Sequence, residues 1–272
     1  MSKLQTSFET LQTGKYLIIS LVSSAFVMML ANHFGEDITK IVTNWIFVPV
    51  PAVLVVLSIL FVIRNGRQGS HGKAWILFAA SAVSWFVAEQ VWLVYDLIYN
   101  VDPFPSPADF FYLVGYASYF AFSIFYLWPV KDAVSKKMII VALVVSVALI
   151  IPTMYFAIDT NSELSQYEIA LAASYPVTDA ITLIPAILGI ALFFGGKVNF
   201  MWSLMLIGIL CDVAGDTGFL VASLDDSYYT GHPIDILFLW AYILFIFGVH
   251  DHMKLFKKRS KENRFNDQAS LR

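Results

Sequence analysis

The feature that most constrains the fold is a series of long apolar stretches that recurs along the whole chain. A stretch of about 18 residues or more with few charges can cross the hydrocarbon core of a bilayer as an α-helix. The chain is 58% apolar and 14% charged, whereas soluble domains average about 45–50% and about 25%. We therefore predict an all-α polytopic membrane protein with eight transmembrane helices, at residues 15–34, 44–63, 74–99, 107–130, 138–158, 168–195, 200–223 and 233–250.

The positive charges predict how these helices are oriented, because cytoplasmic segments of membrane proteins carry an excess of Lys and Arg. Of the 17 lysine and arginine residues, only Lys40 lies away from one side of the predicted membrane. We therefore expect a protein of the cell membrane with both termini in the cytoplasm. Residues 1–14 form a short N-terminal segment, and residues 251–272 form a basic tail, which we expect to lack stable structure beyond about residue 260.

Several residues recur at a nearly fixed spacing, which favours a duplicated unit. At an offset of 127 residues the matched pairs are Pro49 and Pro176, Trp75 and Trp202, and Glu89 and Asp216. After one deletion, the pairs are Pro107 and Pro233, Asp109 and Asp235, and Tyr116 and Tyr242. We predict two repeated four-helix halves, residues 15–130 and 131–250, related by an axis along the membrane normal.

Four acidic residues lie well inside the predicted spans: Glu89, Asp179, Asp212 and Asp216. A charged Asp at the centre of a membrane helix costs at least about 2.5–3.5 kcal/mol, so such residues usually face the protein interior and mark a functional site. Asp212 and Asp216 are four residues apart and share one helix face. No Lys, Arg or His lies in the third, sixth or seventh span to neutralise these acids.

Without a basic partner, these acids have three options: they are protonated, they bind a metal or another cation, or they line a polar cavity open to the outside. A purely structural role also remains open, in which each protonated acid donates a hydrogen bond between helices. We predict a ligand-binding site in which tyrosines are the hydrogen-bonding partners of the acids. Its residues are Glu89, Asp179, Asp212, Asp216, Tyr116, Tyr175 and Tyr242.

Asp109 and Asp235 have a simpler interpretation than the deeper acids. Each begins a predicted span two residues after a proline. Carboxylates are favoured at a helix N-terminus, where unpaired N–H groups and the positive end of the helix dipole meet. We therefore interpret both as helix-start acids, and Asp96 as a helix-end residue of the third span.

Motifs for other chemistries are absent from the sequence. The five histidines lie at span edges or in loops, which weakens a zinc site, and the single cysteine, Cys211, excludes an internal disulfide. No nucleophile elbow, phosphate loop or cysteine cluster occurs. Apart from Lys15 at the edge of the first span, no lysine lies inside a span, which excludes a retinal Schiff base. We predict no cofactor, no metal site and no nucleic-acid partner.

Three segments carry a resemblance to a known group: PFPSPADFFYLVGY, YPVTDAITL and GDTGF. They are similar to an uncharacterised multi-span module that occurs at the N-termini of bacterial diguanylate-cyclase-type (GGDEF) signalling proteins and as stand-alone archaeal membrane proteins. The resemblance spans about residues 40–250 and implies a membrane-embedded sensory or ligand-binding role. No catalytic domain follows here, so we expect the output of such a sensor to come from another protein.

A looser likeness links Asp212 and Asp216 to the eight-span lysoplasmalogenase-type hydrolases. The basic residue and the histidine that this family leads one to expect inside the membrane are absent. The likeness therefore gives only an alternative interpretation.

We expect an integral membrane sensing or ligand-binding module with an acidic cavity that opens outward, rather than an enzyme. Its expected contacts are with the lipid bilayer, with a cation or small polar ligand from the outer side, and with a membrane or cytoplasmic partner protein. Three alternatives remain: a metal-dependent hydrolase acting on lipid, a proton- or cation-coupled transporter, and a structural subunit of a membrane complex.

Overall fold

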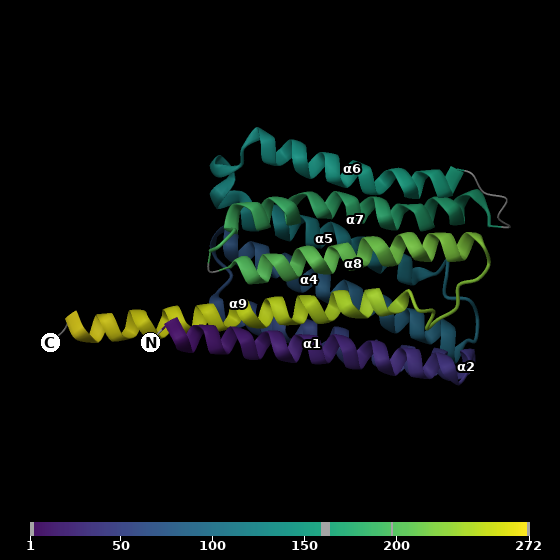
Figure 1. Ribbon diagram of the computed structural model, residues 1–272, viewed down its shortest axis with the longest axis horizontal. Helices are drawn as coiled ribbons and strands as arrows, with labels where there is room; N and C mark the ends of the chain where they lie inside the picture. Colours follow the sequence, from purple (N-terminus) through teal and green to yellow (C-terminus); the bar gives the residue numbers. More distant parts are fainter. Residues whose placement is uncertain (1–2, 159–163, 197, 271–272) are drawn as a thin grey trace.

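The computed structural model (Figure 1) describes residues 3–158, 164–196 and 198–270, with side chains described over 12–64, 66–155, 164–196 and 198–255. The described residues form nine α-helices, one π-helix (η1, Val94–Ile98), one 3₁₀-helix (η2, Trp128–Ala133) and no strand. The α-helices are α1 (Lys3–His33), α2 (Glu36–Ile46), α3 (Pro49–Asn65), α4 (Gly69–Leu93), α5 (Pro107–Leu127), α6 (Lys136–Ile158), α7 (Gln166–Phe193), α8 (Asn199–Leu224) and α9 (Asp235–Ser270).

Within the described residues, eight helical segments are long and apolar enough to cross a membrane, which confirms the predicted all-α, eight-span fold. Helices α2 and α3 together make one of these segments, Glu36–Arg64. Helices α1 and α6 lie at opposite edges of the bundle (Figure 1). Both expose apolar side chains, such as Phe26 and Val144. Lipid tails cover such a surface in a bilayer. The fold is that of a multi-pass membrane protein.

The second span begins earlier than the predicted residue 44. Helix α2 starts directly after Gly35, whose φ of 100° is readily accessible only to glycine. A second helix, α3, starts at Pro49, because proline fits the first turn of a helix and lacks the N–H needed further in. The interior face of α2 carries Thr39, Thr43 and Asn44, so an apolar-run criterion does not detect this helix.

The C-terminal tail also differs from the prediction. Helix α9 continues without a break from Asp235 to Ser270, whereas we expected no stable structure beyond about residue 260. The polar composition of this segment is compatible with a helix because Lys, Glu, Arg and Gln are good helix formers. Residues 271–272 of the predicted tail and residues 1–2 of the N-terminal segment lie outside the described residues.

Six helices form a closed ring around the core. Each packs against two neighbours, in the order α3, α4, α5, α7, α8, α9 and back to α3. Outside the ring, α1 packs against α9 and α6 packs against α7. In this order α4 lies opposite α8, and α5 lies opposite α9. Side chains of these four helices meet inside the ring, as Glu89 of α4 and Tyr242 of α9 do through a hydrogen bond.

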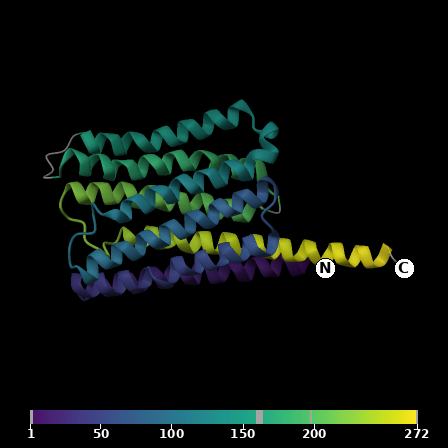
Figure 2. The same cartoon turned by 180° about the vertical axis from the view of Figure 1, so that it is seen from behind.

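The two ends of the bundle differ. The chain termini and the α3–α4, α5–α6 and α7–α8 connections lie at one end, and the α1–α2, α4–α5 and α8–α9 connections lie at the other, which we call the distal end (Figures 1 and 2). At the end nearer the termini, packed aromatic side chains fill the interior of the helix ring. These are Trp75, Phe78, Phe122, Tyr126, Trp202 and His252.

Two glycines bring neighbouring helices of the ring close together. Gly115 of α5 lies against the indole of Trp85, and Gly189 of α7 lies against the indole of Trp202. A Cβ atom at these positions would lie 2.3 Å and 2.2 Å from the two indoles. Small residues at such contacts allow membrane helices to approach closely. The indoles thereby fill the ring interior.

We expect Gly189→Ala to destabilise the protein by about 1–3 kcal/mol, because the added methyl group overpacks a filled interior. Thermal unfolding in detergent measures the effect. The matched control is Gly14→Ala in α1, where a Cβ meets nothing within 4 Å. It should be neutral or stabilise by up to about 1 kcal/mol, because Ala favours a helix over Gly. Equal effects of both substitutions would contradict the described packing.

Candidate ligand-binding cavity

A cavity of about 100 Å³ lies inside the ring, in its distal half; we call it the central cavity. Its wall contains four acidic residues and many aromatic rings, and no Lys, Arg or His of the described residues lines it. The lining residues are Thr43, Asn44, Phe47, Trp85, Glu89, Trp92, Tyr112, Tyr116, Tyr175, Asp212, Asp216, Phe219, Tyr228, Thr230, Asp235, Phe238, Ala241, Tyr242 and Phe245.

Two of the acids accept hydrogen bonds from tyrosines across the ring. The hydroxyl of Tyr242 on α9 donates to Glu89 on α4, with an oxygen–oxygen distance of 2.8 Å. The hydroxyl of Tyr116 on α5 donates to Asp216 on α8, also at 2.8 Å. Hydrogen bonds to a carboxylate stabilise its charged form. Phenol groups therefore replace basic residues as partners of these acids.

Two polar groups in the cavity wall lack a hydrogen-bond partner among the described residues. One is the buried hydroxyl of Thr43. The other is the carboxyl group of Asp212, which is 8% exposed and accepts no hydrogen bond from a described residue. An unpartnered buried polar group costs about 1–3 kcal/mol. A bound molecule with N–H or O–H donors would satisfy both groups.

Asp179 lies beside Asp216 but does not line the cavity. Its side chain is 0% exposed, and neither of its oxygens accepts a hydrogen bond from a described residue. The nearby carboxyl group of Asp216 disfavours a negative charge on Asp179, because like charges repel in a desolvated site. A carboxylate that is fully buried without a hydrogen-bond partner is also costly. Burial therefore favours the protonated form of Asp179.

The two helix-start acids have different surroundings. Asp109 accepts the N–H of Ser106 at 2.6 Å within a capping box at the start of α5, and it also accepts the hydroxyl of Tyr175. Asp109 does not line the cavity, whereas Asp235 does. Asp235 therefore combines a position at the start of α9 with a place in the cavity wall.

The α8–α9 loop, residues 225–234, contributes to the cavity wall at the distal end. The carbonyl of Gly231 in this loop accepts a hydrogen bond from the side-chain N–H of Asn32 at 2.7 Å. The hydroxyl of Tyr229 donates a hydrogen bond to the side-chain oxygen of Asn32, also at 2.7 Å. Thr230 accepts from the indole N–H of Trp92 at 3.1 Å. The loop is thus tied to α1 and α4, which holds it over the cavity.

A second set of bonds fixes the loop to the start of α9. Asp235 accepts from the Gly231 N–H at 2.7 Å and from the hydroxyl of Tyr228 at 3.0 Å. Burial raises the pKa of Tyr228 well above its ordinary value, so its hydroxyl stays protonated and remains a donor. Burial lowers the pKa of His232 in the same loop, so this imidazole is neutral near pH 7.

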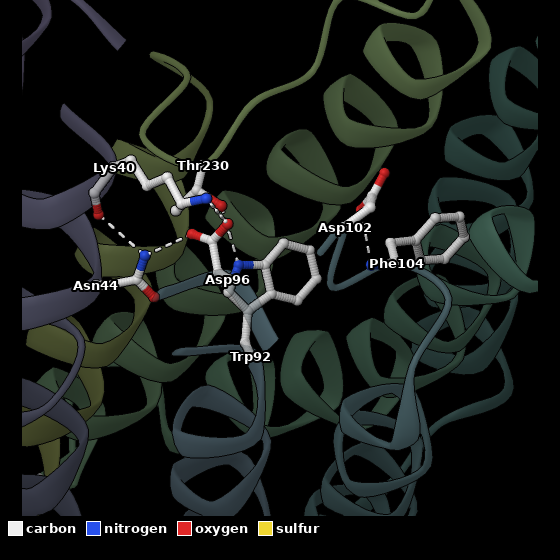
Figure 3. A network of polar contacts seen from close by, with 7 residues as sticks. All are labelled: Lys40, Asn44, Trp92, Asp96, Asp102, Phe104 and Thr230. Carbon is white, nitrogen blue, oxygen red and sulfur yellow. Dashed lines mark hydrogen bonds and ion pairs between the residues drawn. The ribbon is translucent and has the colours of Figure 1, made fainter. Parts of the chain in front are cut away.

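Lys40 belongs to a polar network beside the cavity (Figure 3). Its ammonium group lies 2.8 Å from Asp96 Oδ1, and the Asn44 amide donates to Asp96 Oδ2 at 2.6 Å. Asp96 lies on the π-helix η1, a form of helix that is frequent at functional sites. Lys40 is the basic residue predicted to lie apart from all others, and its charge is matched by Asp96 rather than by an acid of the cavity wall.

Six of the seven predicted ligand-binding residues come together in the wall of this one cavity, although they derive from five helices. They are Glu89, Tyr116, Tyr175, Asp212, Asp216 and Tyr242. Asp179, the seventh, does not line the cavity and is buried near Asp216. The interpretation of Asp235 as only a helix-start acid was incomplete, because this residue also lines the cavity.

The sequence prediction missed the aromatic part of the wall. Trp85, Trp92 and Tyr112 lie in the aromatic-rich third and fourth spans, but enrichment of this kind also marks the interfacial belt of any membrane protein. Phe219 and Tyr228 carry no signal that distinguishes them from other apolar residues. Their role emerges only from the closure of the ring.

Comparison with protein families, with curated proteins and with solved structures finds no match to this chain. The site is therefore interpreted from its own geometry.

We expect Lys40→Met to destabilise the protein by about 2 kcal/mol, because it leaves the buried Asp96 without its cation. The value lies below that of a fully buried pair because Lys40 is 28% exposed. Adding Asp96→Asn should restore most of the loss, since an amide needs no counter-charge. Thermal unfolding of the single and double variants tests this, and a double variant no more stable than Lys40→Met would contradict the network.

A substitution at Asp179 tests whether its buried carboxyl group is protonated. In Asp179→Asn the amide is neutral at every pH, so stability should vary less with pH than in the wild type. The wild-type carboxyl group binds a proton in the folded state, and stability falls as this proton is lost at higher pH. We expect the variant to be the more stable protein at about pH 9 and to differ less at about pH 6. Parallel melting-temperature curves would argue against a protonated Asp179 in the folded state.

Proposed function

We propose that this protein is a membrane-embedded sensing module that binds a small organic cation in the central cavity. The observation that carries the proposal is the composition of the cavity wall: four carboxyl groups and many aromatic rings, with no basic side chain of the described residues. A positively charged ligand supplies the charge that such a wall lacks. A cation with N–H groups, such as an alkylammonium ion, also provides donors for Asp212 and Thr43, which have no partner among the described residues.

Aromatic rings beside carboxyl groups favour an ammonium ion over a bare metal ion. Cation–π attraction reaches about 2 kcal/mol or more in a desolvated site, and aromatic cages are a common means of recognising ammonium groups. Metal sites instead require several close ligands. Among the described residues, no group of three or more His, Cys, Asp or Glu side chains is placed to hold a metal ion. The donor set supports an organic cation and gives no support to the metal-dependent hydrolase.

The volume of the cavity limits the ligand to a few heavy atoms. A cavity of about 150 Å³ holds benzene, and drug-sized ligands occupy about 300–1,000 Å³. The central cavity, at about 100 Å³, is smaller than either. Compact ions such as tetramethylammonium or a short alkylammonium match this size, whereas a lipid does not.

We propose that the ligand enters at the distal end, and that this end faces outward. Arg64 at the end of α3, Arg67 between α3 and α4, and Lys131 in η2 belong to the opposite end, where the termini are. Positive charge collects on the cytoplasmic side of membrane proteins. The cavity lies in the distal half, under the α8–α9 loop.

A sensory role is supported by the course of α9. This helix starts at the cavity with Asp235, passes Tyr242 in the cavity wall and continues to Ser270 beyond the ring. A shift of α9 on ligand binding would therefore move the basic tail, which a cytoplasmic or membrane partner would read. The resemblance to membrane modules of GGDEF signalling proteins supports the same role.

The packed half of the ring favours a binding module over a transporter. A transporter gives its ligand access from both sides of the membrane. Toward the termini, however, Trp75 stacks on His252 with ring centroids 5.0 Å apart, and Trp202 stacks on Phe122 at 6.3 Å. Large interlocked rings of this kind would have to separate to open a path.

Isothermal titration of the protein in lipid nanodiscs with tetramethylammonium tests the proposal. We expect measurable binding of this ion and none of tert-butanol, a neutral molecule with the same number of heavy atoms. A saturating ligand at about 100 times its dissociation constant should also stabilise the fold by about 2.7 kcal/mol. Asp212→Asn should weaken binding by about tenfold or more, because it removes an unpartnered acid from the wall.

The matched control is Asp226→Asn, which removes one exposed acid at the same end of the molecule. Asp226 has a φ of 52°, a conformation that Asn tolerates. Binding should be unchanged in this variant. Equal binding of tert-butanol, or equal losses in both variants, would contradict the proposed function.

A further inference from the structure

The two acid–tyrosine bonds in the cavity are copies of each other at the spacing of the sequence repeat. Asp216 follows Glu89 by 127 residues, and Tyr242 follows Tyr116 by 126 residues. Tyr242 donates to Glu89 and Tyr116 donates to Asp216, both at 2.8 Å. Each acid thus takes its hydroxyl donor from the opposite half of the chain. We call such a pair exchanged, because each hydrogen bond joins a residue of one half to a residue of the other half.

The packed end of the ring shows the same exchange. His252 follows Tyr126 by 126 residues, and Trp202 follows Trp75 by 127. Trp75 stacks on His252 with ring centroids 5.0 Å apart, and Trp202 packs on Tyr126 at 5.3 Å. A ring of one half again meets a ring of the other half in both copies.

A third exchanged pair lies at the distal end. Trp92 of α4 donates to Thr230 in the α8–α9 loop at 3.1 Å. The residues at the corresponding offsets, Phe219 of α8 and Phe104 of the α4–α5 connection, pack with ring centroids 5.2 Å apart. At the helix level, the repeat pairs α4 with α8 and α5 with α9, and these helices lie opposite each other in the ring.

From this exchange we infer that the central cavity is a two-fold site with two facing acid–tyrosine subsites, and that its ligand is a small dication, a short diamine. One subsite is Glu89 with Tyr242, and the other is Asp216 with Tyr116. The inference rests on the proposed function and names the class of cation. Both subsites line the same cavity, which is small enough for one short chain to contact both.

Charge balance separates a dication from a monocation. A monoammonium ion at one subsite places its apolar end against the other carboxyl group and adds no donor there. A diamine that is protonated at both ends brings an ammonium group to each side of the ring, which stabilises both carboxylates in a desolvated site. The second ammonium group should therefore improve affinity rather than add a desolvation cost alone.

The test compares 1,3-diaminopropane with n-butylamine, which have equal numbers of heavy atoms and differ by an ammonium group in place of a methyl group. Titration of the wild type in nanodiscs near pH 7 should show the diamine binding about tenfold or more tighter. Glu89→Gln and Asp216→Asn should each reduce this preference to about twofold or less, because each leaves one charged subsite. Asp226→Asn, outside the cavity, should keep the full preference.

The possible outcomes separate the two proposals. Equal affinity for the two amines overturns the dication inference and leaves the proposed function intact. Loss of the preference in only one of the two variants overturns the two-fold site. Absence of binding by any amine removes the proposed function and this inference with it. If the carboxyl variants do not fold, Tyr242→Phe and Tyr116→Phe replace them: equal losses of the preference support the inference, and a loss in only one contradicts it.

Discussion

Carboxyl groups in the interior of a membrane protein need partners, and in this cavity the described partners are tyrosine hydroxyl groups rather than basic side chains. The requirement links distant parts of the chain, since Tyr116 and Tyr242 reach across the ring to acids on α8 and α4. A phenol donates one hydrogen bond and brings an aromatic ring with it. The same residues therefore satisfy the acids and give the cavity its aromatic wall.

The two ends of the ring interior have different roles. Toward the termini, stacked aromatic rings fill the space and fix the spacing of the helices, as the contacts of Trp202 with Gly189 and Phe122 illustrate. In the distal half, polar groups leave a cavity that the α8–α9 loop covers. Lys40 lies close by, but its ion pair with Asp96 leaves the acids of the cavity wall without a basic partner among the described residues. The packed aromatic end thus holds the helices in place around an acidic cavity.

Much of this architecture was predictable because the apolar spans and the intramembrane acids carry strong signals. The cost of a buried charge identifies Glu89 and Asp216 without any structure. Helix α2 was missed because its interior face is polar, and its Thr43 and Asn44 help to line the cavity. The places of Trp85 and Phe219 in the cavity wall could not be predicted. An aromatic residue in a membrane helix can face lipid, the interface or the protein interior, and the sequence pattern does not distinguish these cases. Which tyrosine meets which acid depends on the order of helices in the ring.

The central claim is that a small organic cation binds beside the acids of the cavity wall. Infrared difference spectroscopy on adding tetramethylammonium measures this directly, because a protonated carboxyl group and a carboxylate absorb at different frequencies. The account predicts that the ion changes the bands of the carboxyl groups in the cavity wall, and that Asp212→Asn diminishes this change. A spectrum in which the carboxyl bands do not change when the ion binds, or change equally in the variant, would contradict it.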